Sequence, residues 1–149
     1  MHTPRDPDFE ARVRASFARQ RLMKTLGARL TRVAAGECEI EMPFNAEFTQ
    51  QHGFLHAGTL TSVADSACGY AAFSLMAPGA AVMSVEFKAN LLAPAAGDAL
   101  IARARVVRSG RTLTIVSGNG YMRSGGEERH VFTMLATMIA VENRKDIID

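Results

Sequence analysis

The sequence has little net charge and no long hydrophobic run, and both absences exclude classes of protein. Among its 149 residues, 17 Lys and Arg face 15 Asp and Glu, so the net charge is only +2. The basic residues are also not gathered into one run of the kind that grips a phosphate backbone, which argues against a nucleic-acid partner. Pro78 and Gly79 interrupt the longest apolar stretch, so no segment is long enough to cross a membrane.

Cysteine is also scarce. Cys38 and Cys68 do not have the spacing of a disulfide framework, and we interpret both as reduced thiols. The first residues are polar and contain no apolar segment of the kind found in secretory signals. Together these features predict a cytoplasmic protein.

The composition that remains, 48% apolar and 21% charged, is typical of a globular protein, and the length fits one domain with a real core. A first helix is predicted within residues 1–27. Its apolar side chains recur at four-residue spacing after Asp6 and Pro7, which favour a helix start, and Gly27 favours its end. We treat this stretch as an N-terminal helical extension.

Strands are predicted on both sides of a second helix. In residues 37–44, Cys38, Ile40 and Met42 alternate with glutamates, as in a half-buried strand. The other strand-like runs are joined by short turns and cover residues 28–35, 81–93, 98–108, 112–123 and 129–141. Long strands joined so tightly favour an antiparallel sheet, and a sheet that curls around the helix covers it economically. The expected class is α+β.

The second helix, predicted from residue 57 to 75, is apolar on nearly all sides, which indicates a buried helix. Asp65 lies in its middle, and the helix contains no Lys or Arg. An unpaired buried carboxylate is costly, so we expect it where its chemistry is used. The alternative is that Asp65 reaches solvent through a gap in the sheet, or is a hydrogen-bonded structural group.

The start of the same helix offers a second chemical group. At His56, Ala57 and Gly58 the first backbone N–H groups have no partners within the helix, and the helix dipole favours an oxyanion there. Such donors, together with a carboxylate, suit acyl transfer. However, Ala57 and Asp65 are eight residues apart, about 12 Å along a helix, so one carbonyl cannot contact both. The spacing predicts a dimer in which two antiparallel helices share each site.

The polar residues of this region occur in a recognisable order: Gln50, Gly53, His56-Ala57-Gly58, Ala64-Asp65-Ser66 and Ser84-Val85-Glu86-Phe87. Over roughly residues 28–142 this order resembles the hotdog-fold acyl-CoA thioesterases of the phenylacetic acid degradation type. The resemblance implies a hotdog domain, with a sheet of about six strands around the central helix, and we take residues 1–149 as this single domain with residues 1–27 as its N-terminal extension. It also implies homodimers or homotetramers with active sites between protomers.

The resemblance assigns roles to particular residues. Asp65 matches the catalytic acid, acting as general base or nucleophile, and Ala57 matches the residue whose N–H polarises the thioester carbonyl. His56 matches a residue that orients this turn, which Gly58 completes. Ala57 stands where the family has glycine, and it keeps the N–H donor.

Two further positions complete the expected catalytic set. Gln50 matches an asparagine that helps to place the thioester or the water, and it keeps the amide with one more methylene. Ser84 matches a hydroxyl that positions the attacking water near the acid.

Other chemistries are less well supported. His52 and His56 are four residues apart, but Gly53 argues against a helix there and no third ligand is evident, so no metal site is predicted. Cys68 lies at helical spacing with core alanines and is interpreted as a structural thiol. Ser66 lacks a nucleophile-elbow motif, which argues against a Ser-His-Asp hydrolase.

A polar turn between two strands is the candidate for binding coenzyme A, which is part of the substrate, so no separate cofactor is predicted. The turn is either a solvated hairpin tip or a site where arginines and N–H groups meet phosphates. The resemblance favours the second interpretation. Lys88 and Asn90 lie at alternating positions of the strand predicted over residues 81–93, and they face either the same ligand or solvent. The turn consists of Arg108, Ser109, Gly110, Arg111 and Thr112.

The sequence thus predicts an acyl-CoA thioesterase that releases free acid and coenzyme A. The alternatives are a non-catalytic, regulatory acyl-CoA-binding hotdog protein and, more weakly, a hotdog dehydratase. Phe54, Leu55, Tyr70 and Phe73 near the helix leave both aryl and medium aliphatic acyl groups open.

Overall fold

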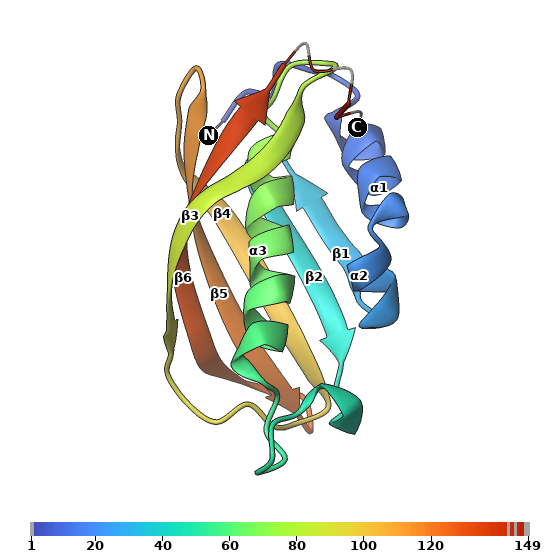
Figure 1. Ribbon diagram of the computed structural model, residues 1–149, viewed down its shortest axis with the longest axis vertical. Coiled ribbons are helices and arrows are strands. Elements are labelled where there is room, and N and C mark those ends of the chain that lie inside the picture. The colour runs from blue at the N-terminus through green and yellow to red at the C-terminus, as the bar shows by residue number, and fades with distance from the viewer. Residues whose placement is uncertain (1, 143, 145, 148–149) are drawn as a thin grey trace.

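The computed structural model describes residues 2–142, 144, 146 and 147. One antiparallel six-stranded sheet curves around a long helix, and a shorter helical segment lies beside it (Figure 1). The predicted α+β architecture is therefore confirmed. The strands are β1 Arg29–Ala34, β2 Glu37–Pro43, β3 Ala81–Leu91, β4 Ala99–Ser109, β5 Leu113–Ser124 and β6 Glu127–Val141. The helices are α1 Phe9–Arg19, α2 Arg21–Thr25, the 3-10 turn η1 Ala46–Phe48 and α3 Ala57–Phe73.

The two edges of the sheet differ in chemistry. The strand order is β1-β2-β4-β5-β6-β3, so β1 and β3 are the outer strands. The edge strand β1 has six residues and carries Arg29 and Arg32, whereas β3 has eleven residues. On β3 the apolar side chains of Met83, Val85 and Phe87 are 48%, 53% and 43% exposed. A long exposed edge strand is a natural site for pairing with another strand.

The core lies between α3 and the concave face of the sheet. Ile40 and Met42 of β2 are fully buried there, as their alternation predicted. The helix approaches the sheet closely at Gly118 of β5, where an added Cβ would lie 2.6 Å from the Cys68 sulfur. Cys38 and Cys68 are both free and buried, and burial raises the pKa of each thiol well above its usual value. Cys68 is thus a buried thiol, as predicted.

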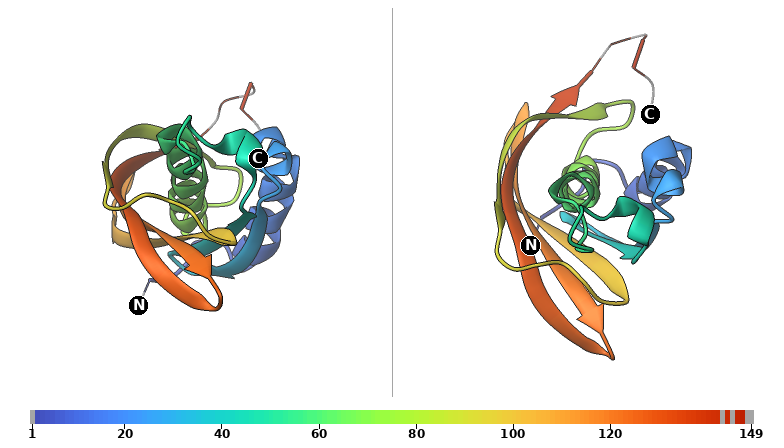
Figure 2. Two further views of the ribbon diagram at one scale, coloured as in Figure 1. Left: turned by 90° about the horizontal axis from the view of Figure 1, so that it is seen from below. Right: turned by 60° about the horizontal axis from the view of Figure 1, so that its bottom comes forward.

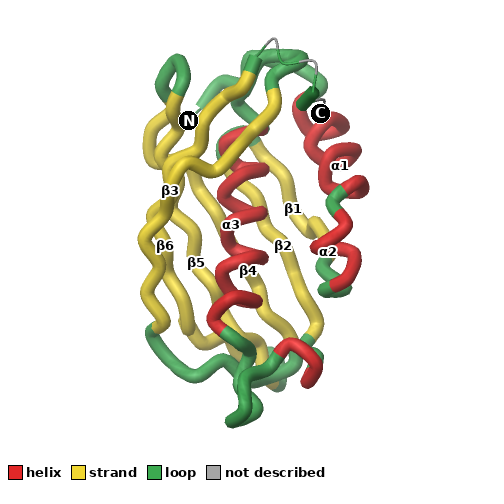
Figure 3. Tube along the Cα trace, viewed as in Figure 1, coloured by secondary structure: helices red, strands yellow, loops and turns green. Residues whose placement is uncertain are grey.

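The N-terminal helix differs from the prediction because it is broken. Gln20 separates α1 from α2 in an extended conformation, with φ −76° and ψ 102°. Asp6 does not cap α1 directly; its carboxylate accepts a hydrogen bond from the Asp8 N–H at 2.9 Å and pairs with Arg12. The chain therefore turns at Gln20 while remaining beside α3 (Figure 3).

The central helix is less enclosed than predicted. Ten of the 17 residues of α3 are buried, but Gly58, Ser62, Asp65 and Gly69 form a partly exposed stripe along one face. The sheet lies behind α3 in Figure 1, and no described helix or strand covers the middle of its front (Figures 1 and 2). Asp65 lies on this uncovered face. Among the described helices, none is long and apolar enough to span a membrane.

Candidate active site

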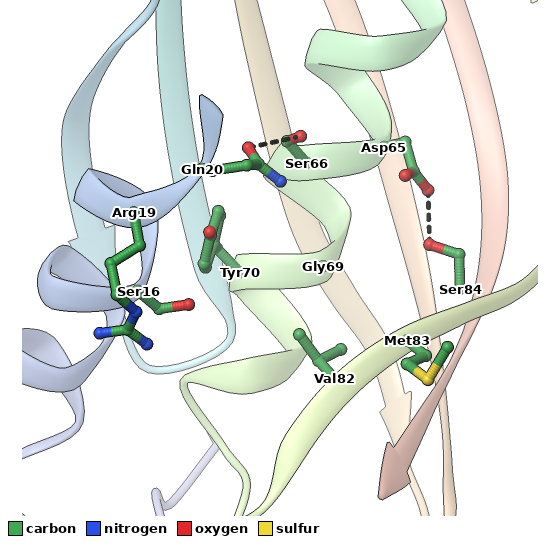
Figure 4. Close-up of a pocket in the computed structure, with 10 residues that line it drawn as sticks. All are labelled: Ser16, Arg19, Gln20, Asp65, Ser66, Gly69, Tyr70, Val82, Met83 and Ser84. Carbon is green, nitrogen blue, oxygen red and sulfur yellow. Dashed lines mark hydrogen bonds between the residues drawn. The ribbon is translucent and has the colours of Figure 1, made fainter. Parts of the chain in front are cut away.

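Asp65 and Ser84 meet across the gap between α3 and β3. The Ser84 Oγ donates a hydrogen bond to Asp65 Oδ1 at 2.7 Å, and the Asp65 side chain is half-buried (Figure 4). The pairing of β3 with β6 shifts register between Ser84 and Glu86, directly beside this contact. Such a bulge changes the direction of a side chain. The structure thus brings together two residues that sequence comparison placed in one site.

A cavity of about 340 Å³ opens beside Asp65. Its walls come from three parts of the chain: the α1–α2 segment, α3 and the start of β3 (Figure 4). The Ser66 Oγ donates to Gln20 Oε1 at 3.2 Å, which ties α3 to the break between α1 and α2. The residues that line this cavity are Ser16, Arg19, Gln20, Asp65, Ser66, Gly69, Tyr70, Val82, Met83 and Ser84.

The wall from the N-terminal segment was not predicted as part of the site. Ser16, Arg19 and Gln20 precede the region of family resemblance, and no motif marks them in the sequence. The break that brings Gln20 to the cavity contains neither Gly nor Pro, the residues that usually signal such a break.

The first turn of α3 leaves one donor unused. His56 is the N-cap, and its Nδ1 accepts a hydrogen bond from the Gly58 N–H at 2.9 Å. The N–H groups of Thr59 and Leu60 both donate to the His56 carbonyl, at 2.9 and 3.2 Å. Within the described chain the Ala57 N–H has no hydrogen-bond partner. Ala57 is the first residue of the helix, a position that alanine occupies as readily as glycine.

Gln50 lies beside this donor, in a second cavity of about 560 Å³. Its Oε1 accepts a hydrogen bond from the His52 N–H, which holds the side chain against the loop. Neither Gln50 nor Ala57 lines the cavity of Asp65, and Asp65 and Ser84 do not line this one. The two groups of candidate residues therefore lie at two separate cavities along α3. The second cavity is lined by Gln50, Phe54, Leu55, Ala57, Leu60, Leu91, Leu92, Ala93, Pro94 and Ala95.

The candidate residues for coenzyme A lie apart from both cavities. The turn Arg108–Thr112 joins β4 to β5 and is closed by the Gly110 N–H, which donates to the Leu113 carbonyl at 2.8 Å. Part of it lies beside the chain that follows α3, where the cavity volume is only about 10 Å³. On β3, Lys88 Nζ donates to Asn90 Oδ1 at 3.1 Å. The side chains of Lys88, Asn90 and the turn are exposed.

Neither histidine near the start of α3 belongs to a metal-ligand cluster. Among the residues described, no group of three or more His, Cys, Asp and Glu side chains is close enough to hold a metal ion. His56 acts as the helix cap, and the His52 ring lies beside the Gln51 amide in the exposed loop.

Comparison with known proteins identifies similar chains by family model, by sequence and by structure. The family model of the thioesterase superfamily matches residues 52–128, which include the start of α3, Asp65 and Ser84. A thioesterase family protein from Silicibacter pomeroyi is 52% identical, with a TM-score of 0.89 over 91% of this chain and 99% of that one. A candidate esterase of Saccharolobus solfataricus is 29% identical over 95 residues, 64% of this chain and 67% of that protein.

A more distant structure shares the fold. The PaaI protein of the E. coli phenylacetic acid degradation operon is 23% identical, with a TM-score of 0.83 over 91% of this chain and 95% of that one. At 23% identity the similarity shows a shared fold, that is, the same arrangement of helix and sheet. Fold, family match and the 52% identical relative agree, and the chain belongs to the thioesterase superfamily, with its hotdog fold.

Proposed function

We propose that the protein is an acyl-CoA thioesterase of the phenylacetic acid degradation type, which hydrolyses an acyl-CoA to a free acid and coenzyme A. One observation carries the proposal: a single helix presents an unused N–H donor at Ala57 and a carboxylate at Asp65, in two separate cavities. Thioester hydrolysis needs both groups at one carbonyl. Membership of the thioesterase superfamily supports the same reaction.

The chemistry follows from the two groups. The Ala57 N–H donates to the thioester carbonyl oxygen, and the helix dipole stabilises the negative charge that develops there. Asp65 of the other protomer takes a proton from water, whose oxygen attacks the carbonyl carbon. The carbon–sulfur bond then breaks, and the coenzyme A sulfur receives a proton. Alternatively the carboxylate itself attacks, and water hydrolyses the resulting anhydride.

Pairing of two β3 edges would supply the second protomer. A two-fold, antiparallel β3–β3 contact joins the sheets and lays two α3 helices side by side in opposite directions. It covers Met83, Val85 and Phe87, which are exposed in the protomer, and it closes the uncovered face of α3. The Asp65 half-site of each chain then meets the Ala57 half-site of the other. The active unit is a homodimer, or a tetramer built as a dimer of dimers.

The phosphates of coenzyme A would bind on the surface, outside the two cavities. Arg108 and Arg111 in the β4–β5 turn offer cationic donors for its phosphates, and the backbone of the turn adds N–H groups. Lys88 and Asn90 extend the polar surface along β3. Because the cavity beside the turn is so small, the nucleotide would lie on the protein and not inside it.

The direct test is a panel of aryl, medium-chain and short-chain acyl-CoAs with the purified protein, read as thiol release. We expect saturable turnover above the uncatalysed rate for at least one acyl group. Saturable binding without thiol release would favour a regulatory acyl-CoA-binding protein. Addition of water to an enoyl-CoA, without thiol release, would favour a dehydratase.

Replacing Ser84 with alanine tests how Asp65 is positioned. The change removes the hydroxyl that donates to the carboxylate. We expect kcat/KM to fall roughly tenfold or more, because a hydrogen bond to a charged group contributes about 1.5–3 kcal/mol. The unfolding temperature should change little, since Ser84 is exposed. Ser84→Thr keeps the hydroxyl and serves as the matched variant. Wild-type kcat/KM in Ser84→Ala would exclude a positioning role.

A further inference from the structure

Gly69 has no structural reason to be glycine within the protomer. It lies in the interior of α3, where glycine costs about 1 kcal/mol relative to alanine. Its φ is not in the left-handed region, and an added Cβ would meet no atom within 4 Å. Neither backbone conformation nor packing in the protomer therefore requires it.

The other glycines of the chain do have such reasons. Seven of the twelve have a positive φ. At four more, an added Cβ would lie 3.2 Å or closer to a neighbouring atom, as at Gly118 against the Cys68 sulfur. Gly69 alone has neither feature. The space that its missing side chain leaves is not used by any described atom of the protomer.

This space opens into the cavity of Asp65. Gly69 lies four residues after Asp65, on the same face of α3 and about 6 Å further along the axis. Both residues line the cavity, together with Tyr70 and Val82. Figure 4 shows Gly69 on the stretch of α3 between the N-terminal segment and the start of β3. An acyl group whose carbonyl carbon is near Asp65, and which runs into this cavity, would pass over Gly69.

We infer that Gly69 determines specificity, by leaving room for an acyl group that is wide a few bonds from the thioester carbonyl, as a branched or cyclic group is. This inference rests on the proposed function and specifies the width of the acyl group that the site accepts. The cavity volume, about 340 Å³, is at the small end of the roughly 300–1,000 Å³ typical of ligand pockets, which suits a compact group. A straight chain is slim enough to pass a side chain at this position.

The test compares octanoyl-CoA with cyclohexylacetyl-CoA, which have the same number of acyl carbons, for wild type, Gly69→Ala and Gly69→Leu. For Gly69→Leu we expect kcat/KM for the cyclic acyl-CoA to fall at least about tenfold relative to the straight one, since even one methylene has such an effect in a shaped pocket. Gly69→Ala should show a smaller fall in the same direction, and a higher unfolding temperature. The control is Ala11→Leu, at an exposed helix position outside the cavity. It should change neither kcat/KM for either acyl-CoA nor the ratio of the two values.

Three results would overturn the inference. Equal losses for both acyl-CoAs would show that Gly69 does not select by width. Dissociation of Gly69→Leu into monomers, measured by light scattering, would assign the space to the partner helix. Wild-type turnover tests the proposed function separately. If the wild type hydrolyses neither acyl-CoA, the proposed function fails. Calorimetry then still tests Gly69, by giving the ratio of the dissociation constants of the two acyl-CoAs for each variant. An unchanged ratio in Gly69→Leu would again refute a role of Gly69 in specificity.

Discussion

Replacing Asp65 with asparagine should lower kcat/KM for acyl-CoA hydrolysis by a factor of about 10²–10⁴, the usual contribution of a positioned acid or base. Asparagine keeps the size of the side chain and still accepts the hydrogen bond that Ser84 donates. What it loses is the ability to take a proton from water or to attack the thioester. Thiol release by purified Asp65→Asn and Asp65→Ala, over a range of acyl-CoA concentrations, measures the loss.

The fold is expected to survive both changes. Asp65 is half-buried on the uncovered face of α3, away from the core between the helix and the sheet. Glu47→Gln removes one carboxylate from an exposed position and controls for the change in net charge. Unaltered rates in both Asp65 variants would remove this residue from the mechanism.

A second variant, Ala57→Pro, should remove the oxyanion donor while keeping the helix. Proline lacks an N–H but is favoured at the first position of a helix, which Ala57 occupies. The preceding residue must then be extended, and His56 already has φ −62° and ψ 144°. Because removal of one oxyanion-hole donor costs about 10²–10³ in kcat, Ala57→Pro homodimers should be nearly inactive.

Mixed dimers distinguish a shared site from a site within one chain. Co-expression of Asp65→Asn and Ala57→Pro with different affinity tags gives a heterodimer that tandem purification isolates. One of its two shared sites combines the intact Asp65 of one chain with the intact Ala57 of the other, so activity should return to about half of the wild-type value per dimer. If each chain held a complete site, both sites of the heterodimer would remain defective. Each homodimer, purified in the same way, is the matched control.

Much of the fold could be predicted from residue patterns. The alternation of Cys38, Ile40 and Met42 with glutamates placed β2 correctly, since a strand turns successive side chains to opposite faces. The contact between Asp65 and Ser84 spans 19 residues, and local patterns do not define it. It was expected from the order of residues in a known family, and the bulge that shapes β3 beside it had no signal of its own.

Hydrophobic periodicity did not predict the open face of α3, for a physical reason. The stripe consists of Gly58, Ser62, Asp65 and Gly69, and its small residues differ little in polarity from the buried alanines around them. Hydrophobic periodicity therefore described a helix apolar on nearly all sides. Both faces of α3 are rich in small residues, so the open face becomes recognisable only once the neighbouring atoms are known. The break at Gln20 was missed because a tertiary contact with Ser66 accompanies it, which no local propensity encodes.

Arg12 of α1 binds the C-terminal end of α3, which gives the N-terminal segment a role in stabilising this helix. Its guanidinium donates to the carbonyls of Phe73, Met76 and Ala77, at 3.2, 2.8 and 2.6 Å, and lies over the Phe73 ring. The last turn of α3 contains no basic residue, so α1 supplies the cation that complements the negative end of the helix dipole. The first 27 residues thus stabilise the far end of the same helix whose beginning offers the oxyanion donor. A shortened chain without them would lose the cation that neutralises the negative end of the α3 dipole. It would also lose one wall of the cavity beside Asp65.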